Sequence, residues 1–127
     1  MDAAQTLADL TEISSQVEAA VLFDEGGVVA GSTLTDAAAG EALARAAGDL
    51  LARASSLGSG TVTQVEASTP TGSVFVVRDG TRLIAATTAP DPTTGLVFYD
   101  LKSALRDSDN AAKPRRRRTT KKSDDAA

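Results

Sequence analysis

The sequence predicts an α/β fold of the α+β kind, in which a five-stranded, mostly antiparallel sheet is sandwiched between helices. Apolar stripes at helical spacing and short β-branched runs follow one another in the order α-β-β-α-β-β-β-α. Glycine-containing turns link the strands into two groups, as hairpins do. One long helical segment separates the two groups, so helices are expected on both faces of the sheet.

The first quarter of the chain predicts a short helix followed by a hairpin. Residues 3–14 carry leucines at helical spacing. Residues 17–23 form an apolar strand, which ends in Asp24-Glu25-Gly26-Gly27, where glycine can take the positive φ of a tight turn. Residues 28–30 are expected to form the second strand.

A long helix is predicted from a cap at Thr35 or Asp36 to about Leu57. Almost every residue in it is Ala, Gly or Leu, so it has more apolar surface than one sheet face can cover. Its charged side chains recur every four residues, at Glu41, Arg45, Asp49 and Arg53. In a domain this small, the second apolar face is expected to meet another chain. The residues expected to make the helix contacts are Leu43, Ala47, Leu50 and Ala54, of which some would face the sheet and some a partner.

The second half of the chain predicts three strands and a closing helix. Residues 61–68 are β-branched but polar, which suits a sheet edge. Residues 73–78 form a continuous apolar run typical of a central strand, and Asp79-Gly80 predicts a two-residue turn into a strand at residues 82–87. Asp91-Pro92 is expected to cap a last helix that fades at Arg106–Asn110.

The residue inventory disfavours an enzyme. The chain has no His and no Cys, which excludes Ser-His-Asp triads, thiol nucleophiles, disulfides and nearly all zinc sites. The only Lys outside the last fifteen residues is Lys102, on the expected outer side of a helix. Asp24 and Glu25 could hold a divalent ion weakly, but are more typical of turn residues. No catalytic residue, cofactor or resident metal is expected.

Charge divides the chain into two parts. Residues 1–112 carry a formal charge of −9 and residues 113–127 carry +5, which together give the net charge of −4. The cations of the second part are Lys113, Arg115, Arg116, Arg117, Arg118, Lys121 and Lys122. This segment could bind anionic lipid, nucleic acid, an acidic protein surface or the chain's own acidic body. The N-terminus lacks the features of a secretory signal, so a cytoplasmic location is expected.

Several local strings resemble the Roadblock/dynein light-chain family, whose bacterial members include the gliding-motility regulator MglB. The best match is the hairpin at residues 17–32 (VEAAVLFDEGGVVAGS), supported by residues 72–80 (GSVFVVRDG), 83–86 and 92–105. The resemblance covers residues 3–107 and implies a profilin-like fold for a domain at residues 1–110. The basic tail at residues 111–127 departs from the family pattern, and its composition predicts disorder, because residues 113–127 hold no aromatic residue, Leu, Ile or Val. It also implies a homodimer in which the long helix packs against its copy and strand edges join.

Two functional hypotheses follow from the sequence. The first is a dimeric, non-catalytic regulator or scaffold of a small Ras-like GTPase, which is the role that the family resemblance implies. The second is an adaptor for nucleic acid or anionic membranes that acts through the basic tail, with two tails in a dimer raising the avidity.

Overall fold

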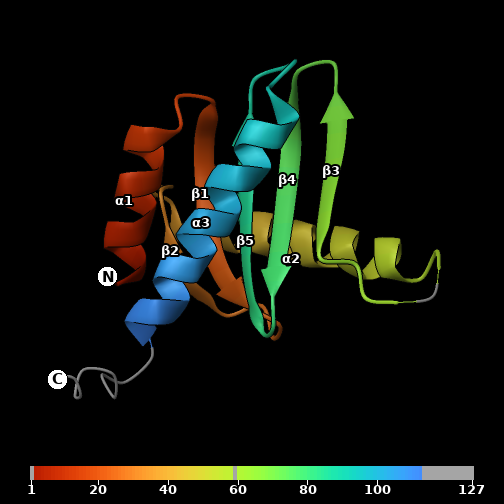
Figure 1. Ribbon diagram of the computed structural model, residues 1–127, viewed down its shortest axis with the longest axis horizontal. Coiled ribbons are helices and arrows are strands. Elements are labelled where there is room, and N and C mark those ends of the chain that lie inside the picture. The colour runs from red at the N-terminus through yellow and green to blue at the C-terminus, as the bar shows by residue number, and fades with distance from the viewer. Residues whose placement is uncertain (1, 59, 113–127) are drawn as a thin grey trace, which may run out of the picture.

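The computed structural model describes residues 2–58 and 60–112 (Figure 1). The expected tail contacts, from Lys113 to Lys122, lie outside these residues. The helices and strands are α1 (Ala3–Ile13), β1 (Val17–Asp24), β2 (Val29–Ser32), α2 (Ala37–Ser55), β3 (Gln64–Thr69), β4 (Gly72–Asp79), β5 (Arg82–Thr88) and α3 (Thr94–Ala112). The predicted element order is confirmed.

The five strands form one sheet in the order β2-β1-β5-β4-β3, and each neighbouring pair is antiparallel. Helices α1 and α3 cover one face of this sheet, and α2 crosses the other face (Figure 1). The predicted sheet between helices is therefore confirmed. The two edges of the sheet are β2 and β3, which the order of the strands places at opposite sides of the molecule.

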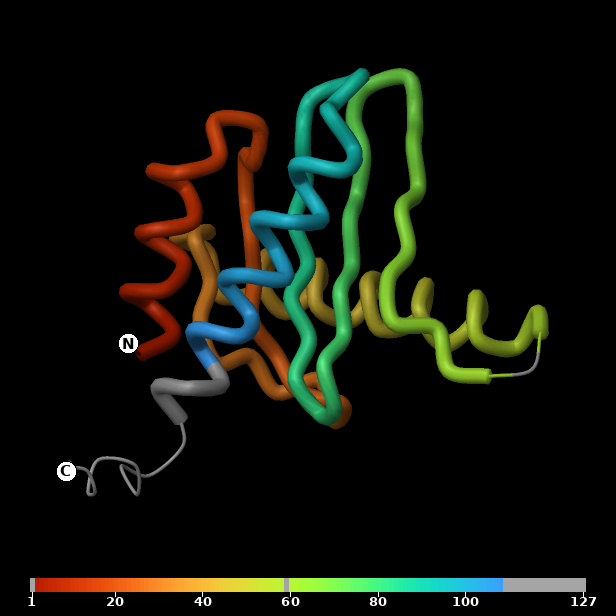
Figure 2. The backbone as a smooth tube through the Cα atoms, viewed as in Figure 1, coloured from red at the N-terminus to blue at the C-terminus, as the bar shows by residue number. Residues whose placement is uncertain are grey.

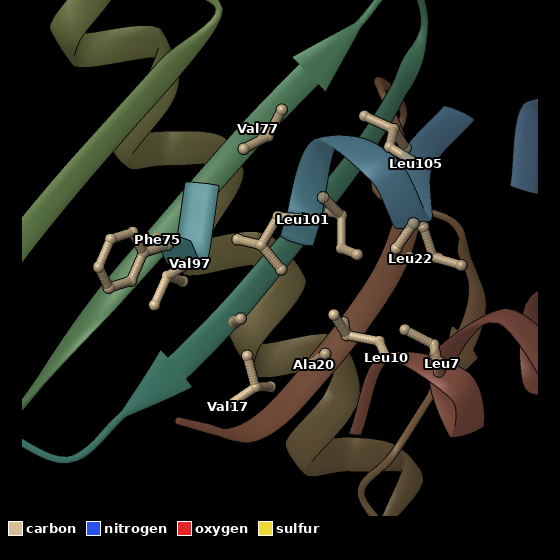
Figure 3. Packing of buried hydrophobic residues seen from close by; sticks show 13 residues of the cluster. Leu7, Leu10, Val17, Ala20, Leu22, Phe75, Val77, Val97, Leu101 and Leu105 are labelled. Carbon is tan, nitrogen blue, oxygen red and sulfur yellow. The ribbon is translucent and has the colours of Figure 1, made fainter. Parts of the chain in front are cut away.

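Alternate residues of the central strands fill two separate hydrophobic clusters, because successive side chains of a strand point to opposite faces. The cluster under α1 and α3 includes Leu22 and Phe75 from the sheet and Leu101 from α3 (Figure 3). Phe75 is fully buried and meets the ring of Phe98 edge to face, with the ring centroids 5.0 Å apart. This arrangement of two aromatic rings is a favourable one.

The second cluster lies between α2 and the opposite face of the sheet. It joins Val21, Phe23, Val76, Leu83 and Ala85 of the strands to buried residues of α2. Because β4 contributes to both clusters, residues 73–78 form the doubly covered central strand that the sequence predicts.

Two local predictions are confirmed by backbone geometry. Asp36 caps α2, since its carboxylate accepts a hydrogen bond of 3.0 Å from the backbone N–H of Ala38. Gly80 has a φ of +63° in the turn that joins β4 to β5, a conformation that favours glycine.

The predicted start of the last helix is wrong. Asp91 has a φ of +59° and lies outside the helix, which begins at Thr94. Asp91 stands between Pro90 and Pro92, and a residue that precedes proline is disfavoured in the helical region. The Thr93 N–H instead donates to the side-chain oxygen of Gln16, 2.6 Å away.

Two other boundaries also differ from the prediction. The helix α3 continues to Ala112, whereas the sequence predicted that it fades at Arg106–Asn110. The strand β3 begins at Gln64, three residues after the predicted start at Thr61.

Candidate protein interaction surface

Helix α2 crosses the strands from β2 to β3, and its last turns extend beyond the β3 edge (Figure 2). The residues that face the sheet are Gly40, Ala44, Ala47 and Leu51, and all four are buried. Their spacing of four, three and four residues follows one face of a helix. Small side chains at three of these positions bring the helix backbone close to the sheet.

The structure separates the four residues that the sequence predicted for helix contacts. Ala47 is only 1% exposed and belongs to the cluster beneath α2, so its side chain contacts its own sheet and cannot reach a partner. Leu43, Leu50 and Ala54 are half-buried and lie on one flank of the helix. Ala47→Glu would therefore bury a carboxylate in the protein's own core, so it would disturb folding and would not report on assembly.

Leu43 and Leu50 belong to a larger apolar strip on this face of the sheet. All members of the strip are partly buried and pack against the cluster beneath α2. They are Leu43, Leu50, Val62, Val65 and Val74, and we call them the α2–β3 strip. Sequence reasoning missed the three valines, because the segment around Val65 looked polar overall. The alternation of apolar and polar residues in this segment could have revealed them, since Val65 and Ala67 share one face of β3.

The open edge of β3 borders this strip. β3 has six residues and pairs only with β4 within the described chain. The opposite edge, β2, has four residues, and α1 approaches it so closely that a Cβ at Gly31 would lie 2.9 Å from the Cβ of Ala3. A short, covered edge resists pairing with another chain, whereas a longer open edge invites it. The edge that is free to pair is therefore β3.

The four charged side chains of α2, which are Glu41, Arg45, Asp49 and Arg53, are all exposed. None of them forms an ion pair with another residue among 2–58 and 60–112. The ion pair within these residues joins Arg78 to Glu25. The charged ladder is thus unpaired inside the described chain.

A cleft of about 420 Å³ lies on the other flank of α2, against the turn between β1 and β2. The Asp24 carboxylate in this turn accepts hydrogen bonds from the N–H groups of Gly26 and Val28, at 2.9 and 3.0 Å. Glu25 pairs with Arg78. The described residues contain no cluster of three or more potential ligands suited to a metal ion. The contacts of Asp24 and Glu25 are those of turn residues, since Asp24 accepts from the turn's own N–H groups and Glu25 pairs with Arg78. Lys102, in the middle of α3, is exposed.

No helix in the part of the chain that the structure describes is long and apolar enough to span a membrane. The predicted tail residues are not tested by the structure, because all of them lie beyond Ala112.

Comparison with protein-family models found no match, and a search of curated proteins found none either. Solved structures do match. A Roadblock/LC7 domain from Streptomyces avermitilis superposes with a TM-score of 0.79 at 18% identity, over 87% of this chain and 98% of that one. The gliding protein MglB from Thermus thermophilus gives a TM-score of 0.71 at 17% identity, over 87% of each chain. A structure described as MglB with tetrameric arrangement gives 0.67 at 17% identity, over 87% of each chain.

The sheet order, the helix on either side and these superpositions define a Roadblock/LC7 fold. Within that fold, the chain is similar in structure to the bacterial MglB proteins.

Proposed function

We propose that two copies of this chain form a homodimer through the α2–β3 strip and the β3 edge, and that the dimer regulates or scaffolds a small Ras-like GTPase in the cytoplasm. The dimer itself catalyses no reaction. The observation that carries the proposal is the position of the strip directly beside an open strand edge. The similarity to MglB proteins, one of them described with a tetrameric arrangement, supports an assembly of several copies.

The α2–β3 strip and the β3 edge favour a two-fold symmetric contact, which is the usual symmetry of homodimers. Antiparallel β3 edges from two copies would join the two sheets and pair their open backbone groups. A second α2 would then lie antiparallel along the first and cover the half-buried leucines. Leu43 of one copy would meet the partner's Leu50 in such a pair.

The charged ladder of α2 lies outside this contact, because Arg45 and Asp49 line the cleft on the other flank of the helix.

The dimer would act on a GTPase by selecting a conformation. A rigid surface that binds one arrangement of the switch loops more tightly than another shifts the population toward it. This mechanism needs no nucleophile, base or metal from the regulator, in keeping with a chain that has no His and no Cys.

Assembly is tested by two matched substitutions on α2. Ala46 and Ala52 are both exposed in the single chain, so a glutamate at either position leaves the core intact. Ala46→Glu places a carboxylate near the proposed axis, where it meets its own copy, and we expect a monomer by sedimentation velocity at micromolar concentration. Ala52→Glu lies on the other flank and should remain dimeric. Equal dimerisation of both variants would show that the α2 flank is misassigned.

The regulatory role is tested with purified Ras-like GTPases from the same organism. We expect the dimer to distinguish the GTP-analogue form from the GDP form in binding, and the Ala46→Glu monomer to lose this discrimination. A dimer that binds neither nucleotide state, or both equally, would refute the role while leaving the dimer in place.

The tail-based adaptor remains a second candidate because of the +5 charge of residues 113–127. Cationic contacts to phosphate make binding strongly salt-dependent. Deletion of residues 113–127 should then abolish salt-sensitive binding to DNA or anionic vesicles. Binding of the GTPase that survives the deletion would favour the first function.

A further inference from the structure

A second surface lies on the opposite face of the sheet, between α1 and α3 (Figure 1). The two helices leave a groove of about 140 Å³. Three carboxylates line it, from Asp9 of α1 and from Asp100 and Asp107 of α3. No cation from the described residues lines the groove.

One buried polar group of the groove lacks a partner. Thr6 is 2% exposed and lines the groove, and its hydroxyl has no hydrogen-bond partner among the described residues. Asp100 is 8% exposed, and no described residue donates a hydrogen bond or forms an ion pair to its carboxylate, whose oxygens keep some access to solvent. Buried polar groups are nearly always hydrogen-bonded, so the Thr6 hydroxyl indicates a missing partner beside a carboxylate that a cation can reach.

The rim of the groove is apolar and strongly exposed. Ile13 is 73% exposed and Tyr99 is 65% exposed, and both line the groove. An aromatic ring beside carboxylates suits a guanidinium group, which stacks on the ring and donates to the oxygens. The carboxylates do not form a cluster suited to a metal ion within the described residues, so an extended organic cation fits better than an inorganic one.

We propose that the α1–α3 groove is a binding site for arginine and lysine side chains, and that its occupant is the chain's own basic segment, residues 113–127. Charge complementarity supports this occupant, because the segment carries +5 and the body carries −9. Tethering supports it as well, since a short linker holds a ligand at an effective concentration on the order of millimolar.

The length of the chain permits the contact. Asp107 and Asp100 lie five and twelve residues before Ala112 on α3, which is about 8 and 18 Å along a helix axis. Arg115 to Arg118 lie three to six residues after Ala112, a reach of roughly 10 to 20 Å for an extended chain. Pro114 favours an extended conformation for the residue before it. A segment that turns back along α3 can therefore bring its arginines to both carboxylates.

The test uses the full chain and a single spin label. Because the chain has no Cys, Ser123→Cys gives one site for a nitroxide. We expect the label to cause a loss of amide signal intensity along the facing sides of α1 and α3 at low salt, and to leave the amides of α2 largely unchanged. High salt should restore the lost signals, since the contact is between charges.

Two double variants with equal charge separate a specific groove from diffuse attraction. Asp9→Asn/Asp107→Asn removes two groove carboxylates whose side chains are not buried, so the fold should persist. Glu18→Gln/Asp79→Asn removes two exposed carboxylates elsewhere. The first should restore several-fold more of the lost intensity at the groove than the second. Equal recovery in both, or signal loss spread over the whole acidic surface, would overturn the proposal.

A mixed sample identifies the chain that supplies the segment. Isotope-labelled protein without nitroxide is mixed with spin-labelled protein that is invisible to the measurement. Signal loss at the groove in this mixture would show that a second copy provides the segment, and would overturn the intrachain assignment. The proposal does not depend on the proposed dimer, because the groove and α2 lie on opposite faces of the sheet. The Ala46→Glu result therefore leaves it untouched.

Discussion

The close packing of α2 on the sheet predicts opposite effects for the same substitution at two glycines of one helix. A Cβ at Gly40 would lie 2.9 Å from the Oγ of Ser32 and 3.2 Å from its Cβ. A Cβ at Gly48 would meet no atom within 4 Å. Gly40→Ala and Gly48→Ala therefore differ in packing and share the same gain in helix propensity.

The magnitudes follow from these contacts. Alanine is about 1 kcal/mol more favourable than glycine inside a helix, so Gly48→Ala should raise the free energy of unfolding by about that amount. At Gly40, overpacking costs typically 1–3 kcal/mol. The Ser32 hydroxyl also accepts a hydrogen bond of 3.0 Å from the Leu34 N–H, and moving it away would cost roughly another 1 kcal/mol. Gly40→Ala should therefore destabilise the protein by about 1–3 kcal/mol.

Urea unfolding followed by circular dichroism measures both variants. The protein concentration must be the same in each experiment, because dimerisation would add to the apparent stability. The difference between the variants cancels the propensity gain and isolates the contact with Ser32, with an expected value of about 2–4 kcal/mol. If Gly40→Ala is as stable as Gly48→Ala, α2 does not pack on β2 as described, and the buried position of Ala47 is in doubt as well.

Four further outcomes are expected. Phe75→Ala should cost about 3–5 kcal/mol in urea unfolding, because the ring is fully buried and its removal leaves a cavity. Asp36→Ala should cost about 1 kcal/mol by the same measurement, since it removes the cap of α2. Gly80→Ala should cost about 1–2 kcal/mol, because φ is +63° at this turn. The double variant Arg45→Ala/Arg53→Ala, assayed at concentrations where it remains dimeric, should keep most of any stimulation of GTP hydrolysis; a fall of about 10³-fold or more would instead indicate an arginine finger.

Short-range patterns made much of the fold predictable. The cap at Asp36 and the apolar run at residues 73–78 each depend on neighbours in the chain, and both predictions are confirmed. The hairpin that Asp79-Gly80 predicts also forms, but its two turn residues are Gly80 and Thr81, because Asp79 still pairs with Arg82 in the sheet. The prediction at Asp91 failed because a proline on either side competes with the capping role that its residue type favours.

The candidate surface was predictable only in part. The excess of small and apolar residues in α2 indicated a second contact surface, but not which residues face the sheet. Ala47 and Leu50 look equivalent in the sequence, yet one is buried against the sheet and the other is half-buried on the flank. The difference is set by the rotation of α2 about its axis, which depends on how closely Gly40 approaches Ser32 on β2.

The sequence by itself determined the order of the elements, the turns, the split between an acidic body and a basic end, and the absence of His and Cys chemistry. These properties are local or compositional, so no knowledge of distant contacts is needed to derive them. Only the tertiary structure decided which sheet edge stays open, which apolar residues form the α2–β3 strip, and that Asp9 and Asp107, far apart in the chain, line one groove. The physical reason is that side chains from separate elements become neighbours only after the sheet has set their positions.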